Sequence, residues 1–120
     1  MVHDLKEIID NAWENREILQ DKDTKIAIKT IIDEIDMGTL RAAEPIENGW
    51  KVNEWVKKAV ILYFPIQKMQ LIEIGPFQFH DKMKLKSGYD KLGVRVVPHA
   101  IARYGSYINR DVVMMPSYVN

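Results

Sequence analysis

The chain has 120 residues, and its 17 Lys and Arg residues balance its 17 Asp and Glu residues. This balance argues against a general binder of nucleic acids, which needs an excess of basic residues. The sequence has no cysteine, which excludes disulfides, thiolate catalysis and Cys-bound zinc for these residues. No apolar run approaches the roughly 20 residues of a membrane span, and the first residues are too charged for a secretory signal, so we expect a cytoplasmic protein.

The first segment is predicted to be an amphipathic helix that fades after Leu19. Asp4 and Glu7 have the spacing of a capping box, with Asp in place of the usual Ser or Thr. The apolar residues of the stripe stand at i, i+3, i+4, i+7 and i+8, at Leu5, Ile8, Ile9, Ala12 and Trp13.

A second helix is predicted between a start signal at residues 21–24 and a C-terminal cap at Gly38. Its apolar stripe is formed by isoleucines, at positions Ile28, Ile31, Ile32 and Ile35. The connection between the two helices is short and polar, which predicts that they pack as an antiparallel pair.

A β-hairpin and a third helix are expected next. Asn48-Gly49 is a strong hairpin-turn signal, and Pro45 limits the first arm to an edge strand or a bulge. Asn53 can cap the following helix. The predicted buried face of that helix consists of Val52, Val56, Ala59, Val60 and Tyr63. We interpret the three tryptophans, Trp13, Trp50 and Trp55, as packing anchors.

After the third helix the pattern is weaker. Residues 69–74 are predicted as a strand that ends at Gly75-Pro76. Residues 77–93 carry several lysines and are predicted as loop, with a short turn near residues 87–90.

The last part of the chain has a six-residue period. Apolar side chains recur at Ile101, Tyr107, Val113 and Val119. An α-helix does not give this period, and a half-buried strand would also be apolar at the even positions between them. A hexapeptide repeat fits, in which each step forms a short strand and a corner of a parallel β-helix. Because the repeat stops in mid-pattern, we expect the chain to be the front part of a longer protein.

Three stretches resemble the tetrahydrodipicolinate N-succinyltransferases of the bacterial lysine pathway. They are residues 35–44 (IDMGTLRAAE), residues 49–62 (GWKVNEWVKKAVIL), and residues 93–98 (GVRVVP) followed by residues 115–120 (MPSYVN). The likeness runs from Ile8 to Asn120. The last stretch is the most specific, since hexapeptide periodicity alone would indicate only a broad acyltransferase superfamily.

The resemblance implies an α+β fold: a mainly helical domain with a β-hairpin over residues 1–93, then the first rungs of a left-handed parallel β-helix over residues 94–120. It also implies a homotrimer with its active site between neighbouring β-helices. The implied reaction moves a succinyl group from succinyl-CoA, the acyl-donor substrate, to the amine derived from tetrahydrodipicolinate, in lysine and diaminopimelate biosynthesis. We expect no metal, no cofactor, no nucleic acid and no membrane partner.

The family's substrate-binding arginine falls on Arg95, and a guanidinium suits a dicarboxylate because it can bind two oxygens at once. Arg103 is a candidate second cation of the same cleft, with a solvated or structural ion pair as the alternative. His99 could be a general base, although a turn residue is the simpler interpretation. The segment from Phe79 to Gly93 looks shorter than in the family.

No catalytic residue is assigned within this chain, because the resemblance places the family's acidic residues and its CoA surface in coils beyond Asn120. The chain alone is therefore predicted to have no activity. The alternative is a non-catalytic assembly or capping module that pairs with a separate β-helix chain.

Overall fold

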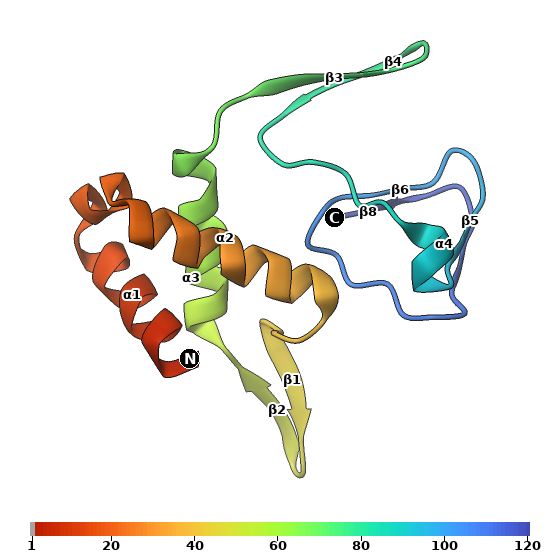
Figure 1. Ribbon diagram of the computed structural model, residues 1–120. Helices are drawn as coiled ribbons and strands as arrows, with labels where there is room; N and C mark the ends of the chain where they lie inside the picture. Colours follow the sequence, from red (N-terminus) through yellow and green to blue (C-terminus); the bar gives the residue numbers. More distant parts are fainter. Residues whose placement is uncertain (1) are drawn as a thin grey trace. The chain divides into compact units, whose positions relative to one another are not determined.

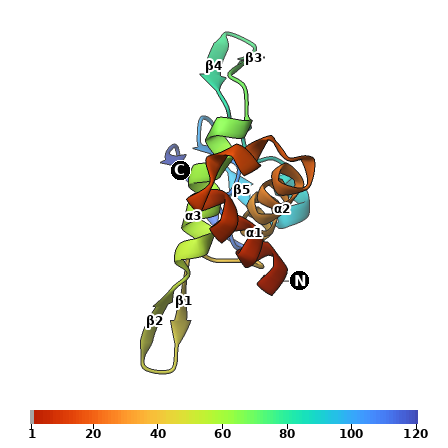
Figure 2. The same ribbon diagram turned by 90° about the vertical axis from the view of Figure 1, so that its left-hand side faces the viewer.

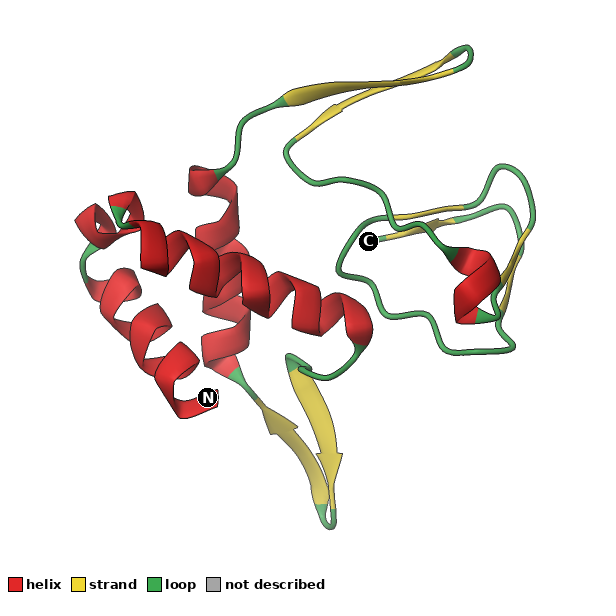
Figure 3. Ribbon diagram, in the orientation of Figure 1, coloured by secondary structure: helices red, strands yellow, loops and turns green. Residues whose placement is uncertain are grey.

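The computed structural model describes residues 2–120. They form two compact units, Met1–Met69 and Gln70–Asn120. The first unit is mainly helical and the second contains short strands (Figure 3), so the chain is α+β. The units meet at residues 69/70, and the segment before residue 94 pairs with the C-terminal residues. The Lys86 N–H donates to the Ala102 carbonyl at 2.9 Å, and Leu85 bridges Arg103 in antiparallel fashion.

Three helices pack against one another in the first unit (Figures 1 and 2): α1 (Val2–Glu14), α2 (Lys22–Met37) and α3 (Glu54–Tyr63). A 3-10 turn, η1 (Arg16–Gln20), joins α1 to α2, and another, η2 (Phe64–Ile66), follows α3. The core between the helices contains the buried residues Ile9, Ala12, Leu19, Ala27, Ile28, Ile31, Ile32, Val56, Ala59, Leu62 and Tyr63.

The predicted limits of α2 are confirmed. Asp21 caps its start, since its carboxylate accepts a hydrogen bond from the Thr24 N–H at 3.0 Å. Gly38 ends it in the left-handed conformation with φ of 80°. The predicted capping box of α1 is wrong, because the helix already begins at Val2 and Asp4 therefore lies within its first turn.

The predicted hairpin is present as β1 (Ala43–Ile46) and β2 (Gly49–Val52), an antiparallel ribbon. Its turn is formed by Glu47 and Asn48, one position earlier than the Asn-Gly signal indicates, since Gly49 already pairs with Ile46. Asn53 precedes α3, but its side chain does not cap the helix. Instead its amide donates to the Arg41 carbonyl at 2.8 Å, which links the two ends of the ribbon.

The predicted packing role of Trp50 is wrong. Trp50 is 66% exposed and Val52 is 63% exposed. The ribbon projects away from the three helices in both views (Figures 1 and 2), and its two strands form a sheet of their own. Trp13, in contrast, is half-buried, and the Arg16 guanidinium lies 4.6 Å from its ring centre.

A second hairpin opens the C-terminal unit. Strands β3 (Gln70–Ile74) and β4 (Phe77–Asp81) pair around the predicted turn at Gly75-Pro76. The predicted strand is confirmed, but the loop prediction for residues 77–81 is wrong. Ile72 opposes Phe79 and Ile74 opposes Phe77, so that cross-strand apolar pairs stabilise the hairpin. A short helix, α4 (Tyr89–Leu92), stands where a turn was expected.

The final strands pair in parallel. Strand β5 (Arg95–Val96) pairs with β7 (Val113–Met114), and β6 (Ile101–Ala102) pairs with β8 (Tyr118–Val119). Val113 stands 18 positions after its partner Arg95, and Tyr118 stands 17 positions after its partner Ile101. This part of the chain is therefore neither a long helix nor an antiparallel meander.

Of the four residues in the predicted six-step series, Val119 packs against the core of this unit, whereas Tyr107 and Val113 do not. Tyr107 and Val113 are 55% and 50% exposed. The small core of this unit instead contains Val94, Ala102 and Met114 as buried residues, with further apolar residues packed on them. Four of its members follow one another at six-residue steps, Val96, Ala102, Ile108 and Met114. Because side chains alternate along a strand, the neighbouring residues point outward.

Candidate functional site

Arg95 lies on β5 with its side chain toward solvent. It stands between Val94 and Val96, which both turn inward, so the strand's alternation directs the guanidinium outward. Its backbone N–H donates to the Val112 carbonyl at 3.0 Å. Gly93 ends α4 just before it, with φ of 70°. The structure therefore presents Arg95 as an exposed cation on a fixed backbone.

Arg103 has a different environment. Its guanidinium binds the carboxylate of Asp81 through two hydrogen bonds, Nε to Oδ2 and Nη2 to Oδ1, both 3.1 Å long. Asp81 is the last residue of β4, and Arg103 directly follows β6. The pair therefore joins the second hairpin to the parallel strands within one unit. This is the structural ion pair that the sequence left open as an alternative.

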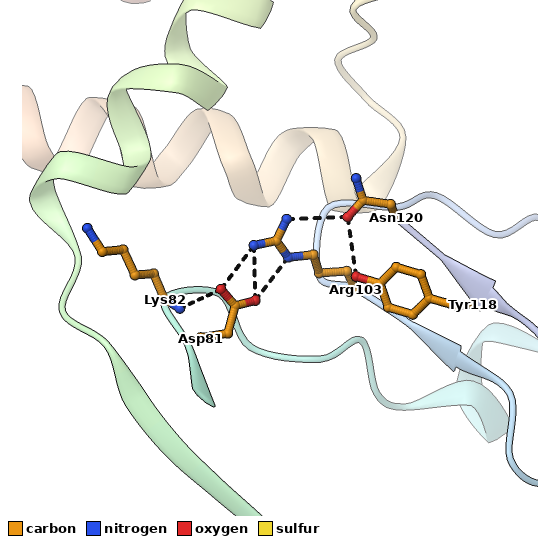
Figure 4. Close-up of polar contacts among 5 residues, drawn as sticks. All are labelled: Asp81, Lys82, Arg103, Tyr118 and Asn120. Atoms are coloured by element: carbon orange, nitrogen blue, oxygen red, sulfur yellow. Dashed lines mark hydrogen bonds and ion pairs between the residues drawn. The ribbon is translucent and has the colours of Figure 1, made fainter. Parts of the chain in front are cut away.

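Three more residues extend this pair into a network (Figure 4). The Lys82 backbone N–H donates to Asp81 Oδ1 at 2.8 Å. Asn120 Oδ1 accepts from Arg103 Nη1 and from the Tyr118 hydroxyl, both at 3.3 Å. Arg103 and Asn120 occupy equivalent positions after β6 and β8, which places the guanidinium and the amide on neighbouring strands.

A hollow of about 400 Å³ adjoins the network. The hairpin forms one wall and the outward face of β6 and β8 forms another. Its lining is mostly apolar, with Arg103 and Asp81 as a charged pair, and consists of Ile72, Gln78, Phe79, His80, Asp81, Met83, Leu85, Ile101, Arg103 and Tyr118. Arg95 and the exposed His99 are not among these residues, so the hollow contains one of the two predicted arginines.

The N-terminal unit has a second hollow, of about 720 Å³, between α1 and the start of α3. Lysines and carboxylates alternate around it, and Lys6 is already paired with Asp10 at 2.7 Å. None of the sequence-predicted binding residues lies there. Among residues 2–120 no group of three or more His, Cys, Asp or Glu side chains could hold a metal ion. In the same range no helix is long and apolar enough to span a bilayer.

Sequence reasoning missed the partner of Arg103. Asp81 is 22 positions away from it, in a segment predicted as loop. One signal was available: the alternation of Phe77, Phe79 and Asp81 after a Gly-Pro turn is that of a second hairpin arm. Recognising this arm would have predicted that Asp81 lies close to the parallel strands.

The observed architecture is a helical N-terminal unit followed by a unit with parallel strands, a hairpin and a carboxylate-bound arginine. The family model of the tetrahydrodipicolinate N-succinyltransferase N-terminal region matches residues 4–66. The chain belongs to this family.

Relatives match over the whole chain. A 2,3,4,5-tetrahydropyridine-2,6-dicarboxylate N-succinyltransferase of Bordetella petrii is 43% identical over 130 positions, which cover 100% of this chain and 48% of the relative. The protein of the same name in Bordetella pertussis is 45% identical, with the same coverage. That of Pseudoalteromonas translucida is 43% identical over 127 positions, covering 98% of this chain and 46% of the relative.

The chain spans about half the length of the curated relatives that it matches. The alignment with the Bordetella petrii protein has 130 positions although this chain has 120 residues. The relative therefore has about ten residues in this region without a counterpart here. We expect this difference to lie between Phe79 and Gly93, the segment that looks shorter than in the family.

Proposed function

We propose that this chain is the N-terminal part of an enzyme that transfers a succinyl group from succinyl-CoA to the amine derived from tetrahydrodipicolinate, in bacterial lysine and diaminopimelate biosynthesis. The observation that carries the proposal is the identity of 43% to 45% with succinyltransferases over the full chain. In this reaction the acceptor nitrogen attacks the thioester carbonyl. The new N–C bond forms and the C–S bond breaks, while a base takes the proton of the amine and passes it to the leaving sulfur, so that CoA leaves as the thiol.

The same proposal includes the architecture of the complete protein. Residues 94–120 are its first coils of a left-handed parallel β-helix, in a cytoplasmic homotrimer. Support comes from the parallel pairing at 18 and 17 positions, close to three six-residue steps, and from the six-step core. The handedness, the trimer and the compartment derive from the resemblance to the family.

Within this chain Arg95 binds a carboxylate of the acceptor, and Arg103 is a second candidate. The exposed position of Arg95 on β5 suits this role, because a guanidinium can donate two parallel hydrogen bonds to one carboxylate. The general base and the CoA surface belong to the half of the relatives that this chain does not cover. The chain alone is therefore expected to give no turnover.

A chimaera tests the proposal. This chain replaces the aligned half of the Bordetella pertussis relative, and release of the CoA thiol from succinyl-CoA is followed with a thiol reagent. Because the chain has no cysteine, it adds no background of its own. We expect acceptor-dependent CoA release by the chimaera and none by the 120-residue chain alone.

Substitution of Arg95 then tests its role. Arg95→Gln is expected to lower kcat/KM for the acceptor by about 10-fold to 100-fold, the effect of one charge-assisted contact. Lys91→Gln, which removes an equal charge from the exposed surface of α4, is the matched control and leaves kcat/KM unchanged. A folded chimaera without acceptor-dependent CoA release would overturn the proposed function.

A further inference from the structure

Asp81 occupies the edge of Arg103 on which a ligand carboxylate would bind. Its two oxygens accept from Nε and Nη2 at 3.1 Å each, and the Nη2 to Oδ2 distance is 3.0 Å (Figure 4). This is the two-point geometry that a guanidinium forms with any carboxylate. A ligand carboxylate that binds the same edge must therefore take the place of Asp81.

The pair is open enough for such an exchange. The side chains of Arg103 and Asp81 are 20% and 36% exposed. Ion pairs that water reaches contribute little net stability, because solvent screens them and competes for the same hydrogen bonds. An exchange of one carboxylate for another leaves the guanidinium with a counter-ion in both states.

The adjoining hollow has the size and the lining for a small organic acid. Its volume of about 400 Å³ lies within the range of about 300–1,000 Å³ that is usual for ligand sites. Ile72 and Phe79 of the hairpin, and Ile101 and Tyr118 of the parallel strands, supply apolar walls. Such walls suit the carbon skeleton of a ligand whose carboxylate is bound by Arg103.

We infer that this hollow binds a dicarboxylate, and that Asp81 is the internal counter-ion that determines how tightly it binds. An incoming carboxylate replaces Asp81 on Arg103, while the carbon skeleton lies against the apolar walls. The inference rests on the proposed function, whose acceptor is a dicarboxylate. It assigns to Asp81 a role in ligand affinity that neither the resemblance nor the pattern of the sequence indicates.

The test measures binding of pimelate, a linear dicarboxylate, to the full 120-residue chain by titration calorimetry. Asp81→Asn keeps the shape of the side chain and an oxygen for the Lys82 N–H, but it removes the charge that competes for Arg103. We expect this variant to bind pimelate about fivefold more tightly than the unaltered chain, the size of effect that a partly exposed ion pair supports. Adding Arg103→Gln abolishes the gain.

Asp90→Asn is the matched control. It removes the same charge from α4 in the same unit, and α4 contributes no residue to the hollow. It is expected to change pimelate affinity by less than about twofold, since screening weakens distant surface charges. Equal or weaker binding by Asp81→Asn would show that Asp81 only anchors the hairpin, and would overturn the inference.

A second measurement does not depend on the folding of any variant. In the unaltered chain, pimelate is expected to shift the Nε–H resonance of Arg103 and the carboxyl carbon resonance of Asp81 together, because one carboxylate replaces the other. If neither resonance moves at saturating pimelate, the inference is contradicted.

The two proposals fail separately. CoA release by the chimaera with no effect of Asp81→Asn on pimelate binding overturns only the dicarboxylate exchange. Tighter pimelate binding by Asp81→Asn without CoA release by the chimaera overturns only the transferase.

Discussion

The side chain of Arg110 lies directly across the backbone of Gly93. A Cβ atom added to Gly93 would stand 2.6 Å from Arg110 Nη1 and 3.1 Å from its Cγ and Cζ atoms. Gly93 also has φ of 70°, a conformation that residues with a side chain rarely adopt. The glycine that opens the GVRVVP motif is thus required both by its backbone and by its neighbour.

Gly93→Ala is therefore expected to destabilise the C-terminal unit more than Gly88→Ala. Gly88 has φ of 76°, but nothing lies within 4 Å of an added Cβ, so its substitution has only the backbone cost of about 1–2 kcal/mol. Amide hydrogen exchange of residues 94–114 measures both effects. The double variant Gly93→Ala with Arg110→Ala is expected to approach the Gly88→Ala value. Equal protection in the two single variants would show that the clash with Arg110 does not affect the stability of the unit.

The register of the six-residue period can be tested with two adjacent residues. Ile108 packs in the core of the C-terminal unit, whereas Tyr107 is 55% exposed. Ile108→Lys should remove the exchange protection of the parallel strands, because a lysine ammonium cannot be buried there without a partner. Tyr107→Lys should preserve it. Loss of protection in the Tyr107 variant instead would support the register that the sequence first predicted.

The N-terminal cap of α2 is expected to be important for the stability of the helical unit. Asp21→Ala removes the carboxylate that accepts hydrogen bonds from the N–H and the hydroxyl of buried Thr24. The expected loss is about 0.5–2 kcal/mol in the free energy of unfolding. All three tryptophans lie in this unit, so urea unfolding followed by tryptophan fluorescence measures it. Asp23 lies in the first turn of α2 but does not cap the helix. Asp23→Ala should therefore lower the free energy of unfolding by less.

A substitution in the core of the three helices is predicted to cause a larger loss of stability. Ile31 is fully buried, while Ile26 on the same helix is 51% exposed. Ile31→Ala is expected to lower the free energy of unfolding by about 2–5 kcal/mol, because it leaves a cavity among packed side chains. Ile26→Ala should change it by about 0.5 kcal/mol or less. Comparable losses in the two variants would contradict the assignment of the buried face of α2.

The helices were predictable because their signals are local. The apolar stripe of Ile28, Ile31 and Ile32, the cap at Asp21 and the glycine at position 38 all lie within one helix or next to it. The β1–β2 hairpin was equally visible from its turn. The exposure of this hairpin could not be predicted, because alternation shows which face of a ribbon is apolar but not whether anything covers that face.

The C-terminal unit was harder because its structure depends on contacts between distant residues. Both Tyr107 and Ile108 fit a six-step series, and only the packing in three dimensions shows that Ile108 is the one in the core. The bond between Asp81 and Arg103 depends on a hairpin whose second arm was predicted as loop. Of the candidate residues, the sequence could name both arginines, but it could not show that one of them already binds a carboxylate.

The two corners of the parallel segment differ in length: residues 97–100 join β5 to β6, and only residues 115–117 join β7 to β8. This single-residue deficit decides that Val119, and not its neighbour Tyr118, turns toward Ala102. Adding one residue to the shorter corner would shift the frame of the following strand and drive an aromatic ring into the space of a valine. An alignment gap placed at this corner therefore reverses, for every position on that strand, whether the side chain is assigned to the core or to the surface.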